Sequence, residues 1–269
     1  MIDALYDKFK EWSKGGSVYI YSDSHFSDLD CYKLRFPDEY EEQVARLCYS
    51  NTLLCDCTHS DKEAEEFSQA HENYKKLKET AFVEKFDKMQ IDNINKLCNK
   101  CDTLVILGDV GNVECVKKLK AGRKILIMGN HDKGKSNYVR IREIVKCFDS
   151  SKLTREDVAI GDLNKGWTLK TEDNKLFDEV YEGQLFIGQR ILLSHEPINF
   201  DFALNIHGHV HSKEKSNKCS FNACAEHINY TPVNLKDILN SGIMKNIKDI
   251  HRDTIDEAIK RKLKKKEEK

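Results

Sequence analysis

Residues 102–111 read DTLVILGDVG, a short aliphatic and β-branched run that ends in glycine and aspartate. The same design occurs in SVYIYSDSH at 17–25, RKILIMGNHD at 123–132, RILLSHEP at 190–197 and LNIHGHVH at 204–211. Continuous apolar strands of four or five residues are typical of a sheet that is covered on both faces. The chain is therefore predicted to be an α/β or α+β layered fold.

Two other regions predict helices. No glycine occurs between Gly16 and Gly108, and the apolar residues of 40–97 keep a three- and four-residue spacing, which predicts a mostly helical insert after the first strand. The segment 236–269 is also predicted to be helical and ends in the lysine-rich KRKLKKKEEK. We therefore expect one domain over residues 1–269 that contains the insert at 40–97 and a C-terminal helical segment with a basic tail.

Two shorter patterns complete the expected fold. Residues 185–193, LFIGQRILL, predict two antiparallel strands joined at Gly188-Gln189. Near the N-terminus the apolar side chains fall at helical spacing and predict an amphipathic first helix; they are Ile2, Leu5, Phe9 and Trp12.

Charge and composition narrow the functional classes. The 269 residues carry a formal net charge of −1, so no global attraction to nucleic acid or anionic lipid is expected, and extended duplex DNA is disfavoured as a substrate. No run of 18 apolar residues occurs, which argues against a membrane span, and the first residues lack the apolar core of a signal peptide. We expect a cytoplasmic protein whose ten cysteines are mostly unpaired thiols.

Each predicted strand ends in oxygen or nitrogen donors. Asp23 and His25 are two residues apart, as are His209 and His211, so in an extended chain both side chains of a pair point the same way. Function in open α/β sheets gathers at such strand ends, where these donors are expected to converge. The full set is Asp23, His25, Asp109, Asn130, His131, His195, His209 and His211.

The chemistry of this set favours a metal centre. Carboxylate, amide and imidazole donors without thiolate suit Mn, Fe, Zn or Ni better than a structural thiolate site or a calcium cage. The donors outnumber what one ion takes while leaving room for substrate, whereas two ions about 3.5–4 Å apart that share a bridging carboxylate fit the number. Each donor alone is more often a core or turn residue, and only the ordered set carries the prediction.

The ordered set is also similar to a family signature. The stretches DSH, GDVGN, GNHD, SHEP and HGHVH match in order the D-x-H, G-D, G-N-H-[DE], H and G-H-x-H motifs. In these motifs the chain resembles the calcineurin-like metallophosphoesterases, and FDEVYEG, ILLSHEPI and YTPVNL resemble their small bacterial and phage-associated branch. The resemblance covers roughly residues 17–40 and 98–240, and it implies a two-sheet sandwich flanked by helices.

The resemblance also implies roles for individual residues. The ligands of one ion would be Asp23, His25 and His211. The ligands of the second ion would be Asn130, His195 and His209, with Asp109 as the bridge. His131 would stabilise the transition state or protonate the leaving oxygen, and Asp132 would orient His131. His207 would not bind metal.

These roles imply a phosphoester hydrolase that uses two divalent ions, with Mn favoured. A hydroxide shared by the ions would attack phosphorus in line. Small phosphoesters or nucleotide-like molecules are the expected substrates, with diesters slightly favoured over monoesters. The alternative is a binding module on the same fold that has lost catalysis. The sequence does not predict an oligomeric state.

Three further expectations concern the surroundings of the site. Basic side chains after GNHD could hold a substrate phosphate, or could form a solvated face; they are Lys133, Lys135 and Arg140. An additional structural zinc could bind Cys55, Cys57, Cys98 and Cys101, although free thiols are favoured there. The insert either caps the mouth of the site and limits substrate size, or packs on the far side of the sheet.

Overall fold

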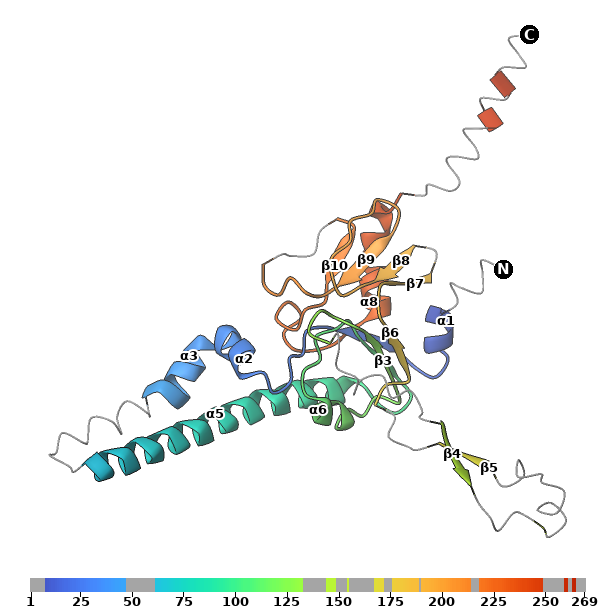
Figure 1. The fold of residues 1–269 in the computed structure, drawn as a ribbon. Coiled ribbons are helices and arrows are strands. Elements are labelled where there is room, and N and C mark those ends of the chain that lie inside the picture. The colour runs from blue at the N-terminus through green and yellow to red at the C-terminus, as the bar shows by residue number, and fades with distance from the viewer. Residues whose placement is uncertain are drawn as a thin grey trace.

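The structure is a computed structural model with two main sheets and a long projecting helix (Figure 1). It describes residues 8–46, 61–132, 144–148, 154, 167–171, 176–188, 190–213, 218–248, 259–260 and 263–264. The predicted first-helix residues Ile2 and Leu5 lie outside them, and the helix that is described, α1 (Lys8–Trp12), buries Trp12.

The larger sheet contains the first three predicted strands. Its order is β11 (Val233–Asn234), β1 (Val18–Tyr21), β2 (Thr103–Ile106), β3 (Arg123–Ile127) and β6 (Glu179–Tyr181). The pairs β1–β2, β2–β3 and β3–β6 are parallel, and β11 is antiparallel to β1. Because Tyr21 pairs with Ile106 and Ile106 with Leu126, the carboxyl ends of β1, β2 and β3 lie level at one edge.

The smaller sheet contains the other two. Its order is β10 (Ser220–Asn222), β9 (Leu204–His207), β8 (Ile191–Leu193) and β7 (Leu185–Gly188). The predicted antiparallel pairing of β7 with β8 is confirmed, while β8–β9 and β9–β10 are parallel. A separate antiparallel pair joins β4 (Ile144–Phe148) to β5 (Trp167–Thr171).

Successive side chains of the central strands point to opposite faces of the larger sheet and so belong to two different hydrophobic cores. On β2, Val105 packs with residues of both sheets, including Ile187 and Ile206. Its neighbours Leu104 and Ile106 face the opposite side, where they pack with helical residues. Both faces of the larger sheet are thus covered, one by the second sheet and one by helices, which confirms the mixed α/β layered fold.

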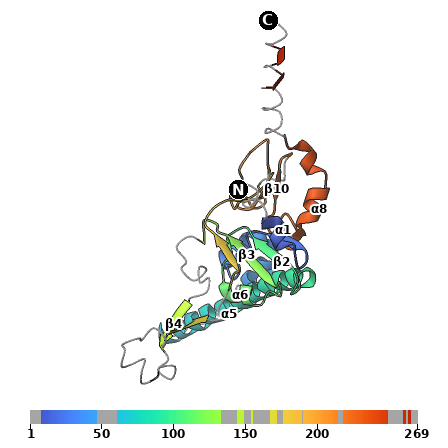
Figure 2. The same cartoon turned by 90° about the vertical axis from the view of Figure 1, so that its right-hand side faces the viewer.

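Some of the other helices pack against these sheets, and others lie beside the long projecting helix (Figures 1 and 2). The helices that follow α1 are α2 (Leu29–Arg35), α3 (Pro37–Tyr40), the π-helix η2 (Glu41–Ala45), α5 (Asp61–Leu97), α6 (Val113–Lys117), α8 (Leu235–Asn240) and the 3-10 helix η6 (Ile243–Asn246). Beyond residue 248, the described residues are 259–260 and 263–264, and they are helical. Within the described residues, no helix combines the length and the apolar character that crossing a membrane requires.

Helix α5 has two different surroundings. Near its C-terminal end, Ile91 and Ile94 belong to the core on the outer face of the larger sheet, the face turned away from the second sheet. Further toward its N-terminus, Phe82 and Phe86 pack with Tyr32 of α2 in a separate small core, and the rest of the helix projects away from the sheets (Figure 1). The base of the insert therefore packs on the far face of the sheet, and residues 47–60 of the insert, which a lid would also involve, lie outside the described part of the chain.

Candidate metal centre

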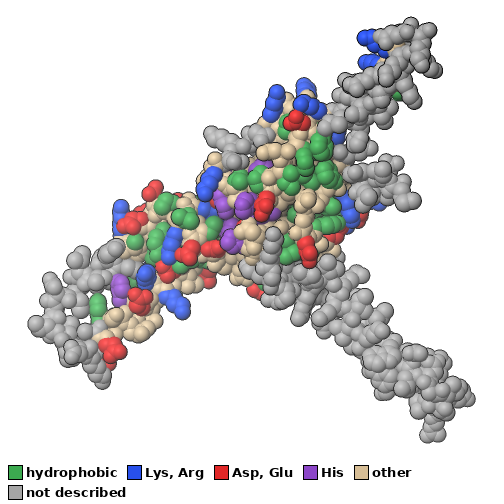
Figure 3. All heavy atoms as spheres, turned by 45° about the horizontal axis from the view of Figure 1, so that its top comes forward, with side chains coloured by type: hydrophobic (Ala, Val, Ile, Leu, Met, Phe, Trp, Pro, Cys, Tyr) green, Lys and Arg blue, Asp and Glu red, His purple; other side chains and the backbone are tan. Residues whose placement is uncertain are grey.

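The predicted donors meet at the edge where the two sheets adjoin. Asp23 and His25 follow β1, Asp109 follows β2, Asn130 follows β3, and three histidines follow β8 and β9. Histidine side chains gather at the middle of the face shown in Figure 3, beside acidic ones. All seven predicted ligand residues take part in the contacts that follow.

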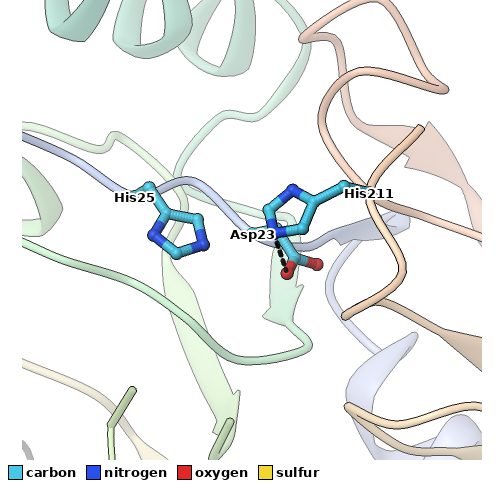
Figure 4. A group of neighbouring side chains, drawn as sticks. All are labelled: Asp23, His25 and His211. Carbon is cyan, nitrogen blue, oxygen red and sulfur yellow. Dashed lines mark ion pairs between the residues drawn. The ribbon is translucent and has the colours of Figure 1, made fainter. Parts of the chain in front are cut away.

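The first group consists of Asp23, His25 and His211 (Figure 4). One potential ligand atom from each lies within 4.8 Å of the others. His211 Nε2 is 3.9 Å from Asp23 Oδ1, and the ring centroids of His25 and His211 are 5.3 Å apart. Asp23 is fully buried and His25 is 6% exposed. Burying such polar groups costs free energy unless hydrogen bonds or a bound cation offset the loss of water.

The second group consists of Asn130, His195 and His209. Asn130 Oδ1 lies 2.9 Å from His195 Nε2 and 3.0 Å from His209 Nδ1. The two ring nitrogens are 3.1 Å apart. His195 Nδ1 donates to the carbonyl oxygen of Leu107 at 2.7 Å, which directs Nε2 toward the other two atoms.

Asp109 lies between the two groups. Its Oδ2 is 3.6 Å from His25 Nε2 and 3.4 Å from His195 Nε2. Asp23 also lies near both groups. Its carboxylate is within 4.8 Å of ligand atoms of His25 and His211, and within the same distance of ligand atoms of Asp109 and His195. The prediction assigned Asp23 to the first group alone, whereas the structure brings it near both.

The electrostatics of the centre favour positive charge. Burial raises the pKa of Asp109, but the hydrogen bond and charge of His195 outweigh burial and lower that pKa to about 2. Burial lowers the pKa of His195, yet the bond to Asp109 and the charges of Asp23 and Asp109 raise it to about 9. The buried carboxylates therefore hold a proton on His195, and the same field would favour a cation in its place.

Several of the donor residues have a strained backbone conformation that orients their side chains. The φ angles of Asp23, His25 and Asp109 are 55°, 46° and 52°, and those of His209 and His211 are 71° and 49°. A non-glycine residue in this left-handed region costs about 1–3 kcal/mol and persists only where its surroundings impose it. Left-handed residues at the strand ends turn the donors toward one another, which is a signal of a functional site that sequence patterns do not carry.

Asp132 supplies part of the constraint on these loops through contacts that were not predicted. It was expected to orient His131, and its buried carboxylate accepts hydrogen bonds from three backbone amides. The donors are Asp109 N at 2.7 Å, Gly129 N at 2.9 Å and Val110 N at 3.1 Å. Asp132 thus ties the loop after β2 to the loop after β3. His131 is positioned through its own backbone amide, which donates to Asp109 Oδ1 at 2.9 Å, and its exposed ring lies 5.4 Å from that of His25.

Helix α5 fixes the loop after β1. Asp87 accepts hydrogen bonds from the backbone amide of Ser27 at 2.8 Å and from its hydroxyl at 2.7 Å. Its Oδ1 also accepts from the Tyr32 hydroxyl at 2.6 Å. Gln90 Nε2 donates to the carbonyl oxygen of Ser24 at 3.0 Å. Because Ser24 and Ser27 flank His25, the insert holds the backbone that presents the first group.

Four further residues touch this group and were not predicted. Ser22 Oγ donates to Asp23 Oδ2 at 2.6 Å, and Cys224 Sγ donates to the same oxygen at 3.2 Å. Glu226 and Arg35 bind each other and approach His211. Ser22 adjoins a predicted ligand in the sequence, but no spacing pattern connects the other three to the motifs.

A cavity opens beside the second group. It has a volume of about 160 Å³ and adjoins Asn130 and His195. The remaining residues that line it are Met128, Gly129, Glu182, Gly183, Gln184, Ser194, Glu196, Pro197 and Ile198. This cavity leaves room for part of a ligand beside Asn130 and His195.

Other predicted residues lie apart or outside the described chain. Lys133, Lys135 and Arg140 are outside it, as are Cys55 and Cys57. Cys98 is buried in the outer core, where burial raises its pKa to about 12, and Cys101 is exposed. His207 is buried, and its Nδ1 lies 2.9 Å from the carbonyl oxygen of Gly208.

Comparisons with known proteins leave the family open. The sequence matches no protein-family model and no curated protein. The structure is similar to the crystal structure of AQ665, a protein of unknown function from Aquifex aeolicus, with a TM-score of 0.43 and 22% sequence identity. The match covers 83% of this chain and 98% of that one, but at this TM-score the similarity supports no argument about function.

Gly208 should tolerate no side chain. An alanine Cβ there would lie 1.9 Å from Ser22 Oγ and 2.3 Å from Asp23 Oδ2, so Gly208→Ala should lower the free energy of unfolding by about 1–3 kcal/mol in urea titrations. Gly188→Ala is the matched control, because its nearest atom would be Ile191 Cδ1 at 3.6 Å. Equal effects of the two substitutions would contradict the packing described.

Removing the Asp87 carboxylate should loosen the loop after β1. Asp87→Ala leaves the Ser27 amide and the Tyr32 hydroxyl without their acceptor and should cost about 1–3 kcal/mol. Hydrogen exchange of the backbone amides from Ser24 to Asp28 should also accelerate. Asp92→Ala, on the same helix but 59% exposed and paired with Lys88, should change neither quantity appreciably. Unchanged exchange in Asp87→Ala would show that α5 does not hold this loop.

Proposed function

We propose that this protein is a phosphoester hydrolase that depends on two divalent metal ions, of the metallophosphoesterase type. The observation that carries the proposal is the convergence of seven separately predicted donors into two adjoining groups with Asp109 between them. The order of the motifs along the chain supports the same reading.

The donors present fit such ions. His25 Nε2 is buried, without a hydrogen-bond partner among the described residues, and 3.6 Å from Asp109 Oδ2. The pKa of His25 is lowered by burial and by the charge of Arg35, so its ring favours the neutral form that binds metal. In the second group, ring nitrogens and the Asn130 oxygen lie about as close as hydrogen bonds allow, as metal ligands would.

The residues that would hold the first ion are Asp23, His25 and His211, and those for the second are Asn130, His195 and His209, with Asp109 shared. When bound, the ions would make water a hydroxide near neutral pH and offset charge on the phosphoryl oxygens. Mn is favoured among Mn, Fe, Zn and Ni.

The chain's own groups would supply the remaining steps. The exposed His131 ring lies beside His25, where it could bond a phosphoryl oxygen or donate a proton to the leaving oxygen. Its backbone bond to Asp109 fixes its distance from the shared carboxylate. Substrates would be small phosphoesters or nucleotide-like molecules, with diesters slightly favoured.

The second candidate is a catalytically silent binding module on this fold. Such a module has no need to keep a complete donor set or an exposed histidine beside it. Here the donors converge and His131 is present, which favours the hydrolase.

Activity assays with Mn²⁺ test the proposal. The wild type should hydrolyse bis-p-nitrophenyl phosphate or p-nitrophenyl phosphate in the presence of metal and lose activity with a chelator. His131→Ala should lower kcat by about 10²–10⁴-fold because a proton donor is lost, and Asp109→Ala should lose activity through lost metal binding. His71→Ala, on the projecting helix α5, should behave as the wild type.

A metal-loaded wild type that hydrolyses neither compound would contradict the hydrolase and favour the binding module. The ratio of the two rates ranks diester against monoester.

A further inference from the structure

A buried ion pair lies directly behind the first group. Arg35 Nε, at the end of α2, donates to Glu226 Oε1 at 2.6 Å. The side chains are 3% and 15% exposed, so the pair is largely removed from water. The two residues are 191 positions apart in the sequence, and neither belongs to a metal-binding motif.

Glu226 controls which nitrogen of His211 faces the centre. The oxygen that accepts from Arg35 also lies 2.9 Å from His211 Nδ1, and a carboxylate can only accept, so Nδ1 carries the proton. The other nitrogen, Nε2, is the one 3.9 Å from Asp23 Oδ1. Carboxylates that bind a histidine in this way fix the ring orientation and make it a stronger metal ligand.

Arg35 holds the other half of the group. Its Nη2 donates to the carbonyl oxygen of Asp23 at 2.6 Å and its Nη1 to that of Ser24 at 3.2 Å. The guanidinium is a rigid fork, so these bonds define the backbone of the loop that carries Asp23 and His25. One ion pair thus contacts the His211 side chain and the Asp23 backbone.

The charge of the pair has its own consequence. Arg35 Nη2 lies 3.5 Å from His211 Nδ1, a short distance from where a cation would bind. Without Glu226 this positive charge would be uncompensated and would repel the cation. Glu226 therefore orients a ligand and also neutralises the guanidinium that fixes the loop.

We propose that Glu226 and Arg35 are positioning residues that set the affinity of the Asp23, His25 and His211 group for a divalent cation. This inference rests on the proposed two-metal function. It predicts a selective effect, because the pair contacts the first group and the second group is held by other bonds.

Glu226→Gln tests it, because glutamine keeps the size and removes the charge. Calorimetric titration of the chain with Mn²⁺ should show two bound ions in the wild type, and the variant should bind one of them about 10–100-fold more weakly with the other unchanged. Glu114→Gln, an exposed carboxylate on α6, is the matched control and should bind both ions as the wild type does. Glu226→Asp keeps the charge and should recover part of the lost affinity.

Combining Glu226→Gln with His211→Asn distinguishes an effect that acts through His211 from a general loss of structure. If Glu226 acts through His211, then Glu226→Gln should weaken binding much less in the His211→Asn background than in the wild type. Equal weakening of both ions, unchanged affinity for both, or additive losses in the double variant would overturn the inference. A wild type that binds no divalent cation would instead overturn the proposed function itself.

Discussion

The in-register parallel pairing of β1, β2 and β3 is the constraint on which the rest of the site depends. It brings the carboxyl ends of three buried strands to one edge of the sheet, so the residues that follow these strands lie close together. The second sheet packs on the same strands and adds the ends of β8 and β9. The site therefore depends on the packing of the core, because its side chains follow directly after buried strands.

The proximity of the strand ends does not by itself orient the donor side chains toward one another. Their orientation requires an unfavourable backbone conformation. Five donor residues are left-handed, and the structure offsets this strain with buried bonds to the loops that carry them. Asp132 joins the loops after β2 and β3, and Asp87 of α5 binds the loop after β1. The long helix thus contributes to the centre from behind the sheet, through backbone contacts.

The sequence predicts the features that depend on neighbouring residues, and it does not predict contacts between residues that are far apart in the chain. Strands and donors such as Asp109 are local patterns, and glycine before aspartate marks the turn where they occur. Glu226 could not be predicted, because its partner Arg35 is 191 residues away and the pairing arises only when α2 meets the loop after β10. The bonds that Asp132 makes could not be predicted for a similar reason, since its partners are backbone amides, which no residue type reveals.

We propose that these strand ends form two adjoining sites for divalent ions. Anomalous diffraction from crystals soaked in Mn²⁺ tests it most directly. We expect one peak on each side of Asp109, the first among Asp23, His25 and His211 and the second beside Asn130, His195 and His209. A crystal that shows no peak at this edge, or metal bound only elsewhere on the chain, would contradict it.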